Sequence, residues 1–178
     1  MAPRAYGKVT MSPTQRDPEP WRHLGATLAG HLTARARGLL GSEFDLLDRE
    51  GTRIGKFEIH GNDGADLRAG DVEARIERVG RSDYAMLYSG EEILTSTGDP
   101  SSPGITSRDH PYTTTLSLLR NKAEAGPKER TTVRITGGLT NRNYQATFAP
   151  GDENSLSVAL FLLYYLISQR SRAYVTGG

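Results

Sequence analysis

The stretch Leu156-Ser157-Val158-Ala159-Leu160-Phe161-Leu162-Leu163-Tyr164-Tyr165-Leu166-Ile167 is apolar at every position except Ser157, and it is the only run of this kind in the chain. A surface helix keeps polar residues on one side, whereas a helix that is apolar all round must be surrounded by protein or by lipid. At 1.5 Å per residue the run gives roughly 18 Å of helix, well short of the about 30 Å hydrocarbon core of a bilayer. A buried strand would also fit, but the length, the many leucines and the absence of Gly and Pro favour a helix. We therefore predict a helix over 154–170 that is enclosed by the rest of the chain.

The residues that flank the run supply start and stop signals for this helix. Asp152 and Asn154 follow Pro150-Gly151 and are N-cap candidates. Arg170 and Arg172 lie where cations favour the C-terminal end of the helix dipole.

Several segments before the run alternate apolar and polar residues, which is the pattern of strands with one buried face. Gly and Asn/Asp turn signals separate them, as in hairpins. The inward-facing sets that we expect are Val72/Ala74/Ile76, Tyr84/Met86/Tyr88, Thr114/Leu116/Leu118, Val133/Ile135 and Tyr144/Ala146/Phe148.

A sheet with one apolar face buries it against a second sheet or closes around something. One apolar helix with about nine or ten inward-facing strands fits a closed antiparallel barrel with the helix along its axis, and closure also removes exposed strand edges. We therefore predict a mainly β fold, a closed barrel around a central C-terminal helix.

The chain before the barrel is less regular. Residues 1–20 are rich in Pro and in small or polar residues, so we expect a disordered leader followed by one domain over 21–178. Within 21–40, Leu24, Leu28 and Leu32 recur at helical spacing, and the residues from Leu32 onward alternate like a strand. This favours a short helix followed by a strand.

The barrel pattern resembles the tubby C-terminal-like superfamily, which includes tubby domains, LURP-one-related proteins and phospholipid scramblases. The resemblance covers roughly residues 30–172. It is carried by the closing apolar helix Leu156–Ile167 and by a hairpin motif matched by Phe44, Leu46, Asp48, Gly51 and Ile54. It implies a twelve-stranded barrel around a central helix, a non-enzymatic role and, in some members, binding to phosphoinositides or anionic membranes.

Composition argues against several classes of function. With 22 basic and 21 acidic residues the chain lacks the charge excess of a nucleic-acid binder. It has no cysteine, which suits a cytoplasmic protein, and we expect that location, with peripheral membrane attachment as an extension of it. Catalytic and cofactor-binding motifs are absent, so we expect no enzyme and no cofactor. The apolar run is too short to cross a bilayer, so we expect no transmembrane span. The scattered His23, His31, His60 and His110 predict no metal site.

Arginines on expected outward faces offer the best candidates for a binding site. Arg donates in a bidentate fork that suits a phosphate or an anionic headgroup. We predict a ligand site from Arg35, Arg37, Arg75 and Arg134. The alternative is a solvated surface on which neighbouring carboxylates neutralise them.

These observations lead to a function and its alternatives. We expect a non-enzymatic binding or scaffold module that recognises an anionic phospholipid or a protein partner through its outer face. A scramblase-like peripheral membrane protein and an enzyme with a site at the barrel rim are the alternatives. The segment 96–108 is long for a hairpin connection, and function or disorder would explain it equally well.

Overall fold

The computed structural model of the chain describes residues 19–128, 130–150 and 152–176. The predicted leader, residues 1–20, lies outside the described residues except for Glu19 and Pro20, which begin the first helix.

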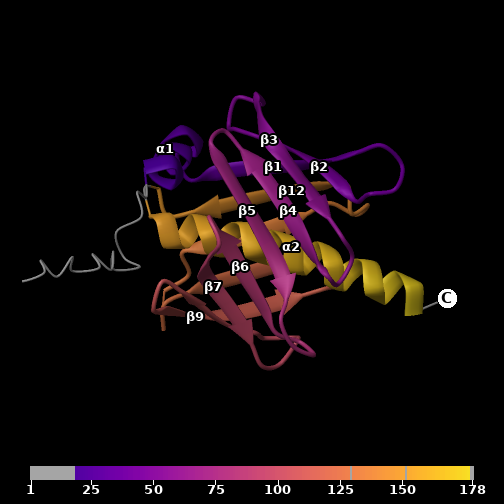
Figure 1. Cartoon of the computed structure of the whole chain (residues 1–178). Coiled ribbons are helices and arrows are strands. Elements are labelled where there is room, and N and C mark those ends of the chain that lie inside the picture. Colours follow the sequence, from indigo (N-terminus) through magenta and orange to yellow (C-terminus); the bar gives the residue numbers. More distant parts are fainter. Residues whose placement is uncertain (1–18, 129, 151, 177–178) are drawn as a thin grey trace, which may run out of the picture.

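Twelve antiparallel strands form a closed barrel, in the order β1-β12-β11-β10-β9-β8-β7-β6-β5-β4-β3-β2. Two helices complete the fold, α1 (Glu19–Leu28) before the barrel and α2 (Glu153–Thr176) after it. Every strand thus pairs with its neighbours in sequence, and β12 closes the ring against β1 (Figure 1). The strands are β1 (His31–Arg37), β2 (Glu43–Leu47), β3 (Arg53–Ile59), β4 (Gly64–Ala69), β5 (Val72–Arg78), β6 (Tyr84–Tyr88), β7 (Glu91–Thr97), β8 (Gly104–Ser107), β9 (His110–Ser117), β10 (Lys122–Gly126), β11 (Val133–Gly137) and β12 (Asn143–Phe148). The predicted closed barrel with its C-terminal helix is confirmed.

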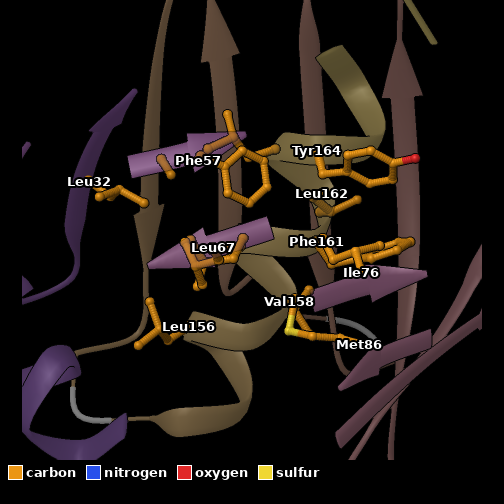
Figure 2. Close-up of a cluster of buried hydrophobic side chains, with 14 of the residues drawn as sticks. Leu32, Phe57, Leu67, Ile76, Met86, Leu156, Val158, Phe161, Leu162 and Tyr164 are labelled. Carbon is orange, nitrogen blue, oxygen red and sulfur yellow. The ribbon is translucent and has the colours of Figure 1, made fainter. Parts of the chain in front are cut away.

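Helix α2 runs through the barrel, and its apolar run makes up the centre of the core (Figure 1). Every residue from Leu156 to Ile167 is buried. Figure 2 shows inward side chains of the wall, among them Leu32, Phe57 and Met86, around the helix. Burying a side chain of this size contributes about 1.5 to 3 kcal/mol, so the helix and the barrel stabilise each other.

The N-terminus of α2 is capped as the sequence indicates. The Asp152 carboxylate accepts hydrogen bonds from the backbone N–H of Asn154 at 2.9 Å and from the Ser155 hydroxyl at 2.8 Å. Asp152 is therefore the N-cap, and Asn154 lies inside the helix. At the other end α2 runs to Thr176 and does not stop at the predicted residue 170. Arg172 and its neighbours are exposed, so this last part of the helix projects into solvent beyond the barrel.

The hairpin motif that carries the resemblance joins β2 to β3. The Asp48 carboxylate accepts hydrogen bonds from the backbone N–H groups of Glu50 and Thr52 at 3.0 and 2.9 Å. Gly51 has a φ of 83°, which a residue with a side chain adopts only at a cost. The motif thus encodes a tight turn between two core-forming strands.

Two sequence predictions need correction. Leu118 does not end an inward-facing strand, because β9 stops at Ser117 and the chain turns there, leaving Leu118 partly exposed. Nearly half of the segment 96–108 is strand and not loop: β7 continues to Thr97, and β8 spans Gly104–Ser107. Residues of these two strands point alternately into and out of the barrel. Ser96, Ile105 and Ser107 lie on the buried inner face.

The two ends of the barrel differ. At one end α1 packs across the opening, where Trp21 meets Tyr88 edge-on at 5.5 Å and Arg22 pairs with Glu153 at 2.7 Å. At the other end, which we call the hairpin end, six turns surround the point where α2 leaves the barrel: β1–β2, β3–β4, β5–β6, β7–β8, β9–β10 and β11–β12.

Candidate functional site

Because α2 fills the barrel, a binding site has to lie on the outer wall or at one end. A barrel of this kind keeps no lumen for a ligand. The candidates are therefore the predicted arginines of the wall and the groups at the hairpin end.

The four predicted arginines lie in three separate places on the wall. Arg35 and Arg37 share the outer face of β1. Arg134 of β11 lies opposite Thr147, which in turn lies opposite His31, so Arg134 and Arg35 are offset by four residues, about 13 Å along the strands. Arg75 lies on β5, four strands from β1 in the other direction, or about 19 Å of sheet.

Carboxylates accompany three of these arginines. Arg75 pairs with Asp66 at 3.0 Å and with Glu77 at 3.5 Å, and hydrogen bonds from His60 and Arg75 hold the pKa of Asp66 below its ordinary value. The other pairs are Arg37 with Glu43 at 3.4 Å and Arg134 with Glu124 at 3.3 Å. Arg35 is exposed between its cross-strand neighbours Asp45 and Asn143. The wall is thus a mixed-charge surface, and the four arginines do not converge on it.

The hairpin end has a different character, because apolar side chains project from it into solvent. All six large hydrophobic side chains that are exposed among the described residues lie on its turns. Five of them are on three adjacent hairpins, β1–β2, β11–β12 and β9–β10, and the sixth is on β5–β6. Their exposed fractions are 95% for Leu39, 93% for Leu40, 95% for Leu139, 36% for Leu118, 99% for Leu119 and 61% for Val79.

We call the three adjacent hairpins, residues 37–43, 117–122 and 137–143, the leucine rim. Beside its five leucines the leucine rim carries four cations and one carboxylate, namely Arg37, Arg120, Lys122, Arg142 and Glu43. Arg120 and Lys122 are exposed and form no ion pair with any residue that the structure describes. Arg172 of α2 adds a further exposed cation where the helix leaves the barrel.

The other half of the hairpin end carries the opposite balance of charge. Its hairpins, residues 59–64, 78–84 and 97–104, hold two arginines and three aspartates. These are Arg78, Arg81, Asp63, Asp83 and Asp99. The hairpin end is thus divided into an apolar, cationic half and a polar, slightly acidic half.

Hydrogen bonds hold the leucine rim in place. Buried Arg170 of α2 donates to the Leu118 carbonyl and, at 2.6 Å, to Asn141 Oδ1, which links β9–β10 to β11–β12. The Asn121 amide donates to the Gly138 carbonyl at 2.8 Å. Arg142 donates to the Gly38 carbonyl at 2.7 Å, so the third hairpin is tied to its neighbour as well.

A hollow of about 460 Å³ lies between two of these hairpins and the end of α2. Leu118, Leu119 and Leu139 line it together with Arg120 and Arg170. It therefore combines apolar surface with cations, which is the combination that an amphiphile requires.

The sequence contains a signal for the leucine rim that the prediction of a wall site leaves unused. Turns are usually polar, yet leucines stand beside turn-forming residues in Gly38-Leu39-Leu40-Gly41 and Gly138-Leu139-Thr140-Asn141. Apolar residues that a turn excludes from the core have to be exposed.

Other kinds of site find less support. Within the described ranges, no three His, Asp or Glu side chains come together in a way that could hold a metal ion. Asn62, Asp63, Asp66 and Asp71 fall on two turns and the strand between them, and not on one loop. No helix in the part of the chain that the structure describes is long and apolar enough to cross a membrane.

Comparisons with known proteins bear on the fold. No protein-family model matches the chain, and no curated protein matches it by sequence. A solved structure, that of the Arabidopsis thaliana protein AT5G01750, matches with a TM-score of 0.56 over 83% of this chain and 94% of that one. The two sequences are 11% identical, so the likeness concerns the fold.

Proposed function

We propose that the chain is a non-enzymatic binding module of the tubby-like kind, which docks at the periphery of membranes that contain anionic phospholipid. The observation that carries the proposal is the charge of the leucine rim, four cations with one carboxylate beside exposed apolar side chains. A cytoplasmic location would bring this end to the leaflet that carries anionic lipid.

Physical chemistry makes an anionic bilayer the best fit to this surface. Each basic residue near such a surface contributes about 1 kcal/mol of attraction, which salt screens over a Debye length of about 10 Å at 0.1 M. The chain as a whole has a net charge of only +1, so attraction depends on the local cluster. The wall offers less, because Arg75 and Arg134 are paired with carboxylates.

The scramblase-like alternative, in which α2 enters the membrane, fits less well. Residues Leu156 to Ile167 are enclosed by the barrel, and their transfer to lipid would leave the inner faces of the strands without a partner. The proposal therefore assigns lipid contact to the hairpins.

Vesicle flotation tests the proposal. The full chain should float with phosphatidylcholine vesicles that contain phosphatidylserine and should not float with phosphatidylcholine alone. Replacing Arg120 and Lys122 together with Gln should weaken binding about thirtyfold and reduce its dependence on salt.

The double variant Arg75→Gln/Arg134→Gln makes the same charge change on the wall and serves as the comparison. It should bind like the parent. If it loses binding while the Arg120/Lys122 variant keeps it, the site is on the wall. If the parent binds neither kind of vesicle, membrane docking is wrong and a protein partner becomes the better hypothesis.

A further inference from the structure

We propose that the leucine rim enters the hydrocarbon of the anionic bilayer, so that the barrel docks tilted, with β1–β2, β11–β12 and β9–β10 toward the membrane. This rests on the proposed function and deepens it, by naming the groups that insert and the orientation that results.

The leucines of the leucine rim project into solvent. Leu39, Leu40, Leu119 and Leu139 are each at least 93% exposed, at the tips of hairpins that neighbour one another in the barrel. Single exposed apolar residues are common on protein surfaces, whereas a group of them on one end marks an interaction site. A site of this kind, with cations beside the apolar tips, is complementary to a bilayer whose headgroups are anionic and whose interior is apolar.

The two halves of the hairpin end differ in their balance of charge. The leucine rim has an excess of cations, whereas the hairpins on the other side carry Asp63, Asp83 and Asp99 against two arginines. An anionic surface attracts the first half and repels the second. The barrel axis should therefore lean toward the leucine rim, and Val79, the exposed apolar residue of the other half, should stay in water.

Hydrogen bonds connect the three hairpins of the leucine rim to one another and to α2. Arg170 ties β9–β10 and β11–β12 to α2, and Arg142 ties β11–β12 to β1–β2. The leucines are thus presented on a supported scaffold, and little conformational freedom remains to be lost on insertion.

The absence of cysteine from the chain allows a direct test. Single cysteines, each labelled with an environment-sensitive fluorophore, are placed at residues 40, 119 and 139 of the leucine rim. Matched positions are 62, 81 and 101 on the other three hairpins and 50 at the opposite end. Vesicles carry phosphatidylserine and lipids with a nitroxide on the acyl chain. We expect a blue shift and quenching at the three rim positions and neither at the four others.

A pair of variants checks the energetics on the unlabelled chain. Leu119→Ser/Leu139→Ser should lower the partition coefficient by about tenfold for each leucine, while Val79→Ser leaves it unchanged. All three positions are exposed, so the melting temperatures should match the parent.

The outcomes separate this inference from the proposed function. Flotation without a spectral shift at the rim overturns insertion and leaves electrostatic docking intact. Quenching at all six hairpins overturns the tilt. Failure of the parent to bind either kind of vesicle overturns both.

Discussion

Leu162 and Leu119 carry the same side chain in opposite surroundings, with exposed fractions of 0% and 99%. An aspartate at position 162 would place a charge in the core without water or a partner, at a cost of several kcal/mol against a typical stability of about 5 to 15 kcal/mol. We predict that Leu162→Asp fails to fold cooperatively, as judged by circular dichroism and urea denaturation. The control, Leu119→Asp, should unfold at nearly the urea concentration of the parent. A Leu162→Asp protein that melts within a few degrees of the parent would place this side chain outside the core.

The same contrast shows what sequence reasoning could resolve residue by residue. Alternation with a period of two correctly predicted that Val133, Ile135, Tyr144 and Ala146 face inward. The reason is that successive side chains of a strand point to opposite faces of the sheet, and only one face of a barrel wall is buried. It failed at Leu118, because a period does not mark the residue at which a strand ends and its turn begins.

Helix α2 is joined to the hairpin end by hydroxyls as well as by apolar contacts. Tyr164 donates to the Gly61 carbonyl at 3.1 Å and Tyr165 to the Pro100 carbonyl at 2.9 Å. Burial raises the pKa of both phenols, that of Tyr165 to about 12. An unfolded tyrosine ionises near 10, so between pH 10 and about 12 the unfolded chain releases protons that the folded chain keeps. The free energy of unfolding should therefore fall as the pH rises through this window.

Urea denaturation at pH 8, 10 and 11 measures this loss. Tyr165→Phe should cost about 1 kcal/mol at pH 8, since the hydrogen bond to Pro100 is gone, and should show a shallower decline at alkaline pH. A variant whose decline is as steep as that of the parent would mean that Tyr165 ionises in the folded state.

The sequence predicts that the central helix and the hairpins exist, but it does not predict the residues at which they end. Period and apolar content identify α2, and Asp152 marks its start. Its end at Thr176 lies beyond the barrel, where packing no longer constrains the sequence, so Arg170 and Arg172 were misleading stop signals. The leucine rim escaped prediction because it depends on which turns become neighbours when β12 closes against β1.

For the molecule as a whole, the closed ring and its central helix predict a single cooperative unit. Each strand has two partners, and α2 contributes to the core on all sides, so no part of the barrel has a core of its own. Helix α1 is the element for which separate unfolding would be easiest, because it packs only across one end. Its Trp21, the single tryptophan of the chain, is fully buried and reports on the docking of α1 against the barrel.

We predict that the unfolding transition followed by Trp21 fluorescence coincides with that followed by far-ultraviolet circular dichroism, which reports on the sheet. The reason is that Trp21 and Leu28 are part of the same core as α2, and exposing them would open the barrel end. Arg22→Gln, which removes an exposed ion pair with Glu153, should leave the two transitions together, because a pair of this kind contributes at most about 1 kcal/mol. Leu28→Ala should instead cost about 2 to 5 kcal/mol and lower both transitions equally. A fluorescence change at lower urea than the circular dichroism change would show that α1 unfolds while the barrel stays closed.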